Sequence, residues 1–284
     1  MRKEIFPMKP NPPPNFTYHF KKIFHEVSRF FEKGSYSIEK IGKNIKAHDV
    51  YLFDSEANDI IINYFKKSFK NSARIISEEG EEICIGTGDP EFTVVIDPVD
   101  GSVNVNRGLN IFSCGIAVLR GLQPLAIDSV ISSMVGNFLV KELYIAQKGS
   151  GAYCSKKIIT GSMSNDPKTF VISIELSHLL SESFPQLLDI LSEVHQVRSL
   201  GSAITAFSLV ASGRLDAHID IRDRLTIENI LPASLLIKEA GGILTDPNGN
   251  ELKPAKDLIQ PFNIVASGNP TIHTWILNKI RPHK

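Results

Sequence analysis

The spacing of hydrophobic residues divides the chain into three stretches with different periods. In the first, apolar residues recur every three or four positions, which predicts an amphipathic helix that ends near Gly34. These residues are Phe16, Phe20, Phe24, Val27 and Phe31. A second helical pattern runs from about residue 49 to 69, and the polar segment 34–47 before it is predicted to be a mobile loop.

From residue 74 onward the period changes, and short runs rich in Ile, Val and Phe between Gly and Pro residues predict strands. These runs are residues 74–77, 92–96, 113–119, 125–131 and 139–146. Later, predicted strands and helices alternate, at residues 169–174, 178–193, 202–212, 215–220, 229–240 and 263–267, before a C-terminal helix. This order favours stacked layers of helices and sheets.

The domain organisation follows from the distribution of Pro and Gly. Residues 1–14 contain five prolines, which favours an extended arm over packed structure. No Pro- or Gly-rich linker divides residues 15–284, so we expect one unit with two subdomains, at about 15–165 and 166–284.

Composition narrows the classes of function. The 31 Lys and Arg residues balance 31 Asp and Glu residues, which argues against a globally basic nucleic-acid-binding protein. No run approaches the ~20 consecutive apolar residues of a membrane-spanning helix, and the charged N-terminus lacks the apolar core of a secretory signal. The odd number and wide spacing of Cys84, Cys114 and Cys154 disfavour disulfides or a zinc site. We expect a soluble, cytoplasmic protein that binds neither nucleic acid nor membrane.

The segment DPVDGSVN, residues 97–104, is the most informative in the chain. It follows the apolar strand FTVVI, so Asp97 and Asp100 lie in a turn at a strand end, where both carboxylates can point into one volume. Carboxylate oxygens suit hard cations such as Mg²⁺. Gly101 allows close approach of the backbone to an anion, and the Ser102 hydroxyl is placed to polarise a water. The alternative is an ordinary turn, since Asp, Pro and Gly are common turn residues.

A second acidic cluster, SEEGEE at residues 77–82, follows the apolar run ARII. If the two strands are neighbours, their carboxylates meet. Glu78 is nearest the strand and is the better metal-ligand candidate, whereas we expect Glu81 and Glu82 to lie in a solvated loop.

Together, four segments resemble the inositol monophosphatase superfamily, in family order and at roughly family spacing. They are SEEG, DPVDGSVN, VRSLGSAITAFSLVASGRLDA and LLIKEAGGILTD. The resemblance is greatest to the archaeal and bacterial fructose-1,6-bisphosphatase/inositol monophosphatase branch. It implies an α/β layered sandwich of alternating helix and sheet layers, and a phosphatase that uses two or three Mg²⁺ ions to activate water directly, without a phosphoenzyme.

The resemblance also implies a metal-ligand set. Glu78, Asp97 and the carbonyl of Val99 are similar to the ligands of a first metal, and Asp97 and Asp100 to those of a second. The family's further aspartate for the second metal corresponds to Asn229. An amide oxygen can coordinate, but the lost charge predicts weaker second-metal binding. Alternatively, Asn229 only caps a helix, or Glu228 takes its place through a one-residue shift.

The resemblance also implies roles for residues that contact the attacking water and the phosphate, and for the loop before the second helix. Ser102 would orient the attacking water, and the Gly101 and Ser102 amides would hold the phosphate. Asp54 resembles the carboxylate that supports this hydroxyl, unless it is a solvent-facing helix residue. The sequence GKNI at residues 42–45 lacks the family's loop aspartate and second glycine, so a contribution to a third metal is not predicted.

Substrate signals are fewer. Gly201 and Ser202 resemble a segment that lines the sugar pocket, although a tight helix N-terminus would have the same sequence. Arg222 stands where inositol-specific members carry an acidic residue, and a guanidinium fits a second phosphate better than a hydroxyl. This favours fructose 1,6-bisphosphate over inositol 1-phosphate, which an Arg222→Glu exchange would test. Arg198 either faces the anion or is a surface arginine.

We therefore predict a Mg²⁺-dependent phosphatase of small sugar or polyol phosphate monoesters, forming a homodimer or homotetramer. Two alternatives stay open. One is hydrolysis of 3′-phosphoadenosine 5′-phosphate, which needs a base-binding pocket. The other is a non-catalytic phosphate-binding homologue with a weakened second metal site.

Overall fold

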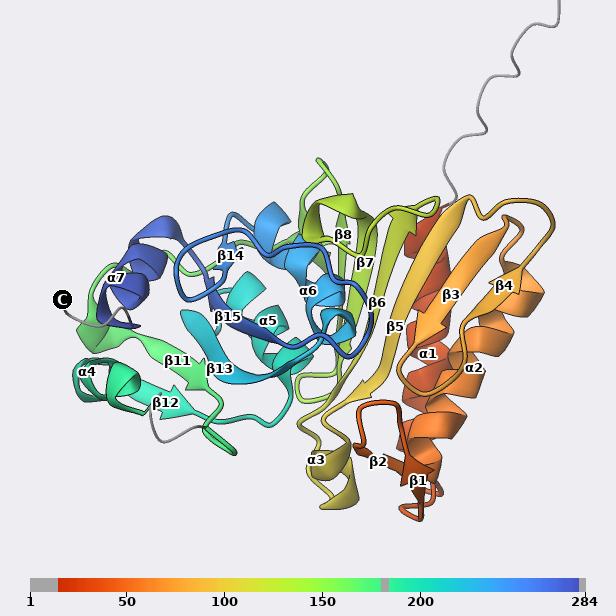
Figure 1. Cartoon of the computed structure of the whole chain (residues 1–284), viewed down its shortest axis with the longest axis horizontal. Helices are drawn as coiled ribbons and strands as arrows, with labels where there is room; N and C mark the ends of the chain where they lie inside the picture. Colours follow the sequence, from red (N-terminus) through yellow and green to blue (C-terminus); the bar gives the residue numbers. More distant parts are fainter. Residues whose placement is uncertain (1–14, 180–183, 281–284) are drawn as a thin grey trace, which may run out of the picture.

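The computed structural model describes residues 15–179 and 184–280, and the predicted proline-rich arm at 1–14 lies outside them. Within the described residues the elements form alternating layers (Figure 1). Helices α1 (Phe16–Glu32) and α2 (Leu52–Ser68) cover one face of an eight-stranded sheet. Helices α5 (Ala203–Ala211) and α6 (Ile227–Glu239) lie between this sheet and a five-stranded one. Helices α4 (Pro185–Glu193) and α7 (Pro270–Ile280) form the last layer, so the predicted layered α/β fold is confirmed.

The large sheet has the strand order β10-β9-β8-β7-β6-β5-β3-β4. Its strands are β3 (Ala73–Ser77), β4 (Ile83–Ile85), β5 (Phe92–Asp100), β6 (Ser113–Arg120), β7 (Val130–Asn137), β8 (Glu142–Gln147), β9 (Ala152–Cys154) and β10 (Lys157–Ile158). All neighbouring pairs are antiparallel except β3 and β5, which run parallel. This one parallel pair brings the ends of β3 and β5 to the same edge of the sheet.

The five-stranded sheet has the order β12-β11-β13-β15-β14. Its strands are β11 (Val171–Ile174), β12 (Gln196–Arg198), β13 (Ala217–Leu225), β14 (Ile243–Thr245) and β15 (Phe262–Ser267). The chain leaves the large sheet after residue 158 and enters the five-stranded sheet at residue 171, on either side of the predicted boundary at 165. The division into two subdomains stays a prediction, because α5 and α6 pack against both sheets.

Two apolar cores lie on the two faces of the large sheet. The predicted Phe20 and Val27 of α1 are fully buried against α2 and the large sheet. Ile23, which the predicted stripe did not include, is buried with them, whereas Phe24 is only partly buried. The second core lies around α5 and α6 and contains Phe207 and Leu231. Burial of a large apolar side chain contributes about 2 kcal/mol each, so both faces of the large sheet are fixed by many such contacts.

Gly115 allows the α6 layer to approach the large sheet closely. A Cβ atom at this position would lie 2.7 Å from Ile204 Cδ1 and 2.8 Å from Pro232 Cβ, closer than carbon atoms pack. Gly115 pairs with Asp97 across β5 and β6. The missing side chain therefore brings the first turns of α5 and α6 close to the predicted site.

Several sequence predictions were wrong in detail. The predicted loop 34–47 contains strand β1 (Lys40–Lys43), which pairs with β2 (Asp49–Tyr51) in a two-stranded sheet. Because residues 49–51 join this hairpin, the second helix begins at Leu52. The predicted strand 125–131 is interrupted by a 3-10 turn, Ile127–Ser129, and only its last two residues belong to β7. Hairpin pairing with β6 and β8 sets this register, which local apolar content does not reveal.

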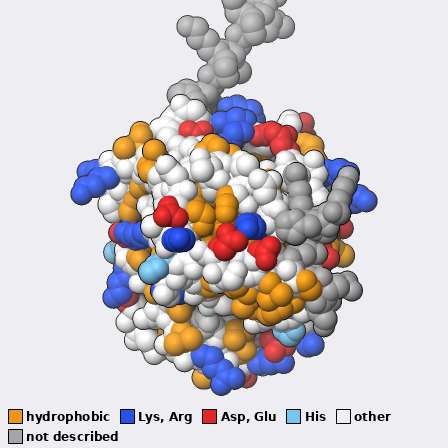
Figure 2. Space-filling model, turned by 90° about the vertical axis from the view of Figure 1, so that its left-hand side faces the viewer, with side chains coloured by type: hydrophobic (Ala, Val, Ile, Leu, Met, Phe, Trp, Pro, Cys, Tyr) orange, Lys and Arg blue, Asp and Glu red, His pale blue; other side chains and the backbone are white. Residues whose placement is uncertain are grey.

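Two surface properties bear on the expected partners. On the face shown in Figure 2, acidic and basic side chains are interspersed, as the balanced charge of the chain suggests. In residues 15–179 and 184–280, no helix combines the length and apolar character needed to cross a bilayer.

His273 on α7 provides a test of the last layer. The imidazole is 5% exposed, and its two nitrogens lie 3.0 Å from Thr245 Oγ1 and 3.2 Å from Ser267 Oγ. Burial lowers the pKa of His273 to about 4, so the unfolded chain takes up a proton near pH 6.5 and the folded chain does not. We expect this group to reduce the free energy of unfolding by about 3 kcal/mol between pH 7 and pH 4.

Urea denaturation at several pH values compares the wild type with His273→Gln. The variant should lose this component of the acid destabilisation, whereas His25→Gln, at an exposed position of α1, should follow the wild-type curve. Parallel pH curves for wild type and His273→Gln would contradict the prediction.

Candidate active site

The two acidic segments meet because β3 and β5 are parallel neighbours. Ser77, the last residue of β3, pairs with Ile96 of β5, so Glu78 and Asp97 follow these partners at the same edge. Asp97 is completely buried and Asp100 is the last residue of β5. The convergence predicted from sequence is therefore present.

Gly101 turns the chain from β5 into the short helix α3 (Ser102–Asn106). Its φ is 103°, a left-handed conformation in which a side chain is strained. A Cβ atom would lie 2.8 Å from the carbonyl oxygen of Ile111 and 3.1 Å from Ser202 Cβ. Glycine is therefore required both by the backbone conformation and by the packing of the turn.

Asp54 and Ser102 form a partly buried pair. Ser102 Oγ lies 2.8 Å from Asp54 Oδ1 and 2.9 Å from the carbonyl oxygen of Val99, and Asp54 Oδ2 accepts the N–H of Tyr51 at 2.9 Å. Burial raises the pKa of Asp54 to about 7, although the hydrogen bonds from Tyr51 and Ser102 lower it. Asp54 is 1% exposed, so it is not the solvent-facing helix residue of the alternative interpretation.

Asp100 is held by the start of α5. Its Oδ2 accepts hydrogen bonds from Ser202 Oγ at 2.5 Å and from the N–H of Ile204 at 2.7 Å. Burial raises the pKa of Asp100 to about 6, and both hydrogen bonds oppose this shift. Ser202, predicted to line the substrate pocket, is 2% exposed and positions Asp100 instead, while the neighbouring Gly201 does line the cleft.

Asn229 contributes its amide nitrogen to the site. Its Oδ1 accepts the N–H of Thr226 at 3.1 Å in a capping box of α6, and its Nδ2 donates to Asp97 Oδ2 at 2.8 Å. This arrangement corresponds to the helix-capping interpretation. Coordination of a cation through the amide oxygen would require the amide to turn over and give up both contacts.

A cleft of about 490 Å³ opens over these residues, and both acidic and basic side chains line it. Among its described lining residues are Asp97, Asp100, Gly101, Ser102, Gly201, His48, Lys46, Arg222 and Arg224. Arg222 Nε and Nη2 donate to the buried carboxylate of Asp220 at 2.8 and 2.6 Å, which fixes the guanidinium at the cleft. Arg198 does not line it: Arg198 Nη1 donates to Gln196 and to the carbonyl of Val197.

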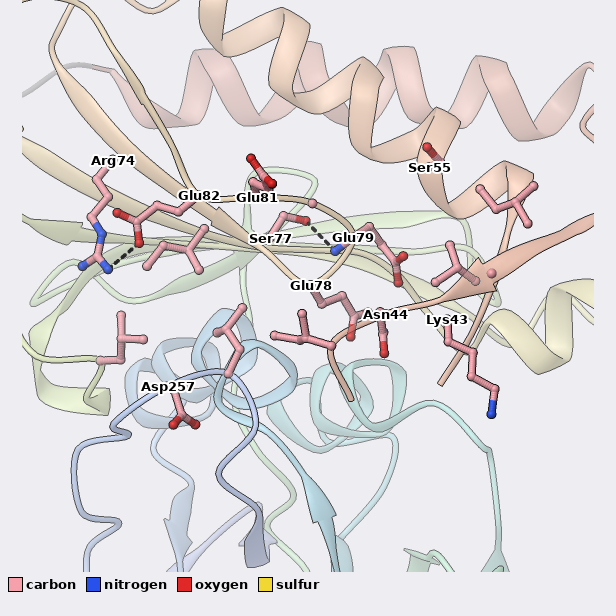
Figure 3. Close-up of a pocket in the computed structure, with 18 of the residues that line it drawn as sticks. Lys43, Asn44, Ser55, Arg74, Ser77, Glu78, Glu79, Glu81, Glu82 and Asp257 are labelled. Atoms are coloured by element: carbon pink, nitrogen blue, oxygen red, sulfur yellow. Dashed lines mark hydrogen bonds and ion pairs between the residues drawn. The ribbon is translucent and has the colours of Figure 1, made fainter. Parts of the chain in front are cut away.

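A larger cleft of about 710 Å³ shares Asn44, Glu78 and Glu79 with the first (Figure 3). Arg74 and Glu82 form an exposed ion pair at its edge. Burial, followed by the charge of Glu78, raises the pKa of Glu79 to about 8. Glu78 therefore stands between two open spaces, both reachable from solvent.

Known proteins share both the sequence pattern and the fold of this chain. A model of the inositol monophosphatase family matches residues 22–284. The chain belongs to this family. It is 30% identical over 258 residues to the fructose-1,6-bisphosphatase/inositol-1-monophosphatase of Methanocaldococcus jannaschii, covering 91% of this chain and 95% of that protein.

Solved structures agree with this assignment. The extragenic suppressor protein suhB of Bartonella henselae superposes with a TM-score of 0.77 at 25% identity, covering 95% of this chain and 98% of that one. An inositol monophosphatase–fructose 1,6-bisphosphatase superposes with a TM-score of 0.74 at 29% identity, covering 93% and 97%. The resemblance deduced from sequence is confirmed, as is the expectation of a phosphoric monoester hydrolase.

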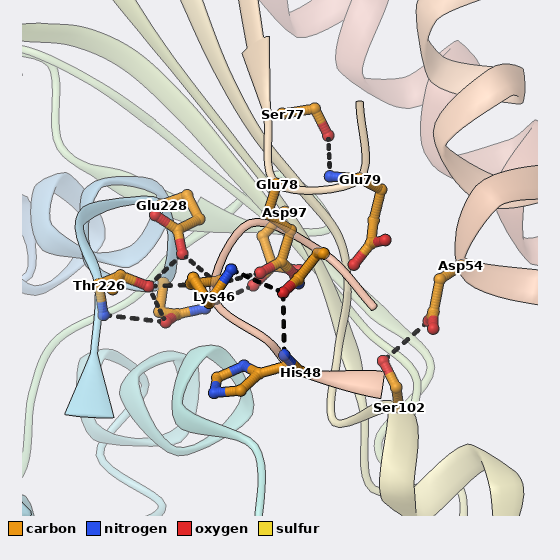
Figure 4. Close-up of polar contacts among 12 residues, drawn as sticks. Lys46, His48, Asp54, Ser77, Glu78, Glu79, Asp97, Ser102, Thr226 and Glu228 are labelled. Atoms are coloured by element: carbon orange, nitrogen blue, oxygen red, sulfur yellow. Dashed lines mark hydrogen bonds and ion pairs between the residues drawn. The ribbon is translucent and has the colours of Figure 1, made fainter. Parts of the chain in front are cut away.

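Lys46 is the site residue that sequence reasoning missed. It lies in the turn between β1 and β2, and its ammonium forms ion pairs with Glu78 and with Glu228, the latter at 2.7 Å (Figure 4). It also lies 3.3 Å from Thr226 Oγ1. Burial alone would lower the pKa of Lys46, but the charges of Glu78 and Glu228 raise it further than burial lowers it. Its partners are 32 and 182 residues away, so no local pattern indicates the contact.

Carboxylate oxygens without partners remain beside Lys46. Burial, then the charges of Glu78 and Asp100, raise the pKa of Asp97, and burial raises that of Glu228. Asp97 Oδ1 and Glu228 Oε2 are buried and have no hydrogen-bond partner among the described residues. Orphaned carboxylate oxygens of this kind fit a hard divalent cation. Nevertheless, no group of three or more His, Cys, Asp or Glu side chains in the described part of the chain is arranged to hold one.

Gly101 allows a direct test of this site's scaffold. We expect Gly101→Ala to reduce the free energy of unfolding by about 3 kcal/mol, through left-handed strain and contact with the Ile111 carbonyl. Gly108 is a matched control, since its φ of 72° is also left-handed but a Cβ atom there would meet none of the described residues within 4 Å. Gly108→Ala should cost about 1 kcal/mol in urea denaturation. Equal losses for the two variants would contradict the packing argument.

Proposed function

We propose that this member of the family is a Mg²⁺-dependent phosphatase of small sugar or polyol phosphate monoesters. The observation that supports it best is the convergence of Glu78, Asp97 and Asp100 at one cleft beside the Ser102–Asp54 pair. The relatives named as fructose-1,6-bisphosphatase/inositol-1-monophosphatase support the substrate class.

Carboxylates from two neighbouring strands would hold the cations. Glu78, Asp97 and the carbonyl of Val99 form one donor set, and Asp97 with Asp100 a second, while Asn229 offers a nitrogen in its present orientation. When bound, divalent cations would polarise the attacking water and neutralise charge on the phosphate. The orphaned Asp97 Oδ1 supports this role, because a buried carboxylate oxygen without a partner is costly.

The chain's own residues position the reactants. Asp54 accepts from the Ser102 hydroxyl and so fixes its orientation at the edge of the cleft. The N–H groups at the start of α3 face an anion favourably, since the first amides of a helix lack partners. The Ser202 hydroxyl and the Ile204 N–H hold Asp100 in one rotamer, which limits the reorganisation needed when a cation binds.

The first test is phosphate release from fructose 1,6-bisphosphate and inositol 1-phosphate, with Mg²⁺ titrated into the high-millimolar range. We expect release that saturates only at high Mg²⁺, because Asn229 and Lys46 both reduce the negative charge available to the cations. Folded protein that releases no phosphate from either substrate would favour the non-catalytic phosphate-binding alternative. Among described cleft residues, Tyr51 is the one Phe, Tyr or Trp side chain, which gives the nucleotide alternative little support.

Asp97 is predicted to destabilise the metal-free protein and to be required for activity. Because burial raises its pKa, its charged form is disfavoured in the folded protein without a cation. Asp97→Asn should therefore leave the thermal midpoint of the metal-free protein unchanged or raise it, while phosphate release falls at least about 100-fold. The exposed Glu81, in the segment that also carries Glu78, is the control, and Glu81→Gln should retain activity. An Asp97→Asn variant with substantial activity would remove Asp97 from the proposed role.

Arg222 supports fructose 1,6-bisphosphate as the better substrate, since its guanidinium is fixed at the cleft by Asp220. A glutamate there would place two carboxylates together, so Arg222→Lys is the cleaner variant. It keeps a positive charge and loses the planar fork. We expect kcat/KM for the bisphosphate to fall about tenfold more than for inositol 1-phosphate. An equal fall for both would exclude recognition of the second phosphate by Arg222.

The finer expectations on assembly and location stay predictions. Light scattering on the full chain tests the homodimer or homotetramer, and fractionation of the source cells tests a cytoplasmic location.

A further inference from the structure

Lys46 reaches into the acidic site from a separate small hairpin. The β1–β2 turn is shaped by Asn44, whose Oδ1 accepts the N–H groups of Lys46 at 3.0 Å and His48 at 3.1 Å. The side chain of Lys46 is 7% exposed, and those of Glu78 and Glu228 are 11% and 0% exposed. The turn therefore delivers an ammonium group to a buried position between two carboxylates (Figure 4).

Glu228 explains why a cation is needed at this point. It is completely buried, and its Oε1 contacts Lys46 Nζ and Thr226 Oγ1. An unpaired charge at such a depth costs several kcal/mol. Lys46 is the one basic side chain with an ion pair to Glu228 in residues 15–179 and 184–280.

The same ammonium also uses the donor set of the proposed metal site. Glu78 directly follows β3 and lines the cleft, and its Oε2 is paired with Lys46. With Asn229 donating to Asp97 on the other side, two nitrogen groups stand among the carboxylates where divalent cations would require oxygen. Because Lys46 and Asn229 place nitrogen groups where divalent cations need oxygen ligands, the site as folded does not offer enough oxygen ligands for a full set of divalent cations.

We propose that Lys46 is a resident cation of the site, occupying the position between Glu78 and Glu228 in place of one divalent metal ion. Of the two donor sets named above, the one that includes Glu78 is then taken by the ammonium, and divalent cations bind only through Asp97 and Asp100. The proposal rests on the proposed phosphatase function only in treating the remaining cation site as catalytic. The position of the ammonium does not depend on catalysis. It follows that removing the ammonium creates a site for one more divalent cation.

The test counts Mn²⁺ ions bound per chain, by electron paramagnetic resonance of free Mn²⁺, in wild type and Lys46→Met. The variant replaces the ammonium with an uncharged side chain of similar length and leaves Glu78 and Glu228 facing each other. We expect it to bind one Mn²⁺ more than the wild type. Its thermal midpoint should rise by several degrees more on Mn²⁺ addition, since the cation stabilises only the folded chain.

Two variants serve as controls. Lys46→Arg keeps the positive charge and should bind as many Mn²⁺ ions as the wild type. Lys43→Met removes an exposed charge from the same hairpin and should also leave the count unchanged. Equal Mn²⁺ counts for wild type and Lys46→Met would overturn the proposal.

A measurement on the wild type covers the case in which Lys46→Met does not fold. An amine-reactive reagent is applied with and without saturating Mn²⁺, and modification of Lys46 and of Lys43 is followed by mass spectrometry. A resident ammonium stays protected in both conditions, with labelling at least tenfold slower than at Lys43. Mn²⁺-induced labelling of Lys46 at the rate of Lys43 would show that metal displaces it, and would overturn the proposal.

These readouts separate the two proposals. A wild type without phosphatase activity, but with the Mn²⁺ difference between wild type and Lys46→Met, refutes the catalytic function and retains the resident cation. A wild type that releases phosphate, but binds as many Mn²⁺ ions as Lys46→Met, retains the catalytic function and refutes the resident cation.

Discussion

The burial of several carboxylates at one edge of the large sheet is the constraint on which this molecule depends. Asp54, Asp97 and Glu228 are each at most 1% exposed, and Glu78 and Asp100 lie among them. Like charges this close repel one another, and burial removes the water that would screen them. Other parts of the folded chain must therefore provide hydrogen-bond donors and positive charges to these carboxylates. Much of the local structure around the site has this role.

Three separate pieces of the scaffold meet this requirement. The first turn of α5 provides an N–H and a hydroxyl to Asp100, α6 provides the Asn229 amide to Asp97, and the β1–β2 turn provides Lys46 to Glu228. Helix starts are well suited to the task because their first N–H groups lack partners. The close approach of the α6 layer at Gly115 explains how two helix starts reach the end of one strand.

The sequence predicted the parts of this site that are coded locally. Two acidic segments after apolar runs placed Glu78, Asp97 and Asp100 at strand ends, because strand ends and turns follow from short-range pattern. That the two strands are neighbours was a condition of the prediction, and the parallel pairing of β3 with β5 meets it. The layered fold was also predictable from periods and from family resemblance. Strand registers after residue 125 and the β1–β2 hairpin were not, since cross-strand pairing decides them. Ser202 was predicted to line the substrate pocket, but its hydroxyl donates to Asp100, a contact that only the packing of α5 against β5 determines.

Lys46 shows why long-range charge pairing escapes such reasoning. In the sequence it is one of several lysines in a polar segment, and nothing nearby distinguishes it from Lys40 or Lys43. In the fold, Lys40 pairs with Asp49 at the surface, where water and salt screen the two charges. Lys46 instead compensates a carboxylate with no access to water, so losing it would expose the full cost of that burial. The same residue type, at two positions of one hairpin, thus has a minor role or a decisive one according to the depth at which its partner lies.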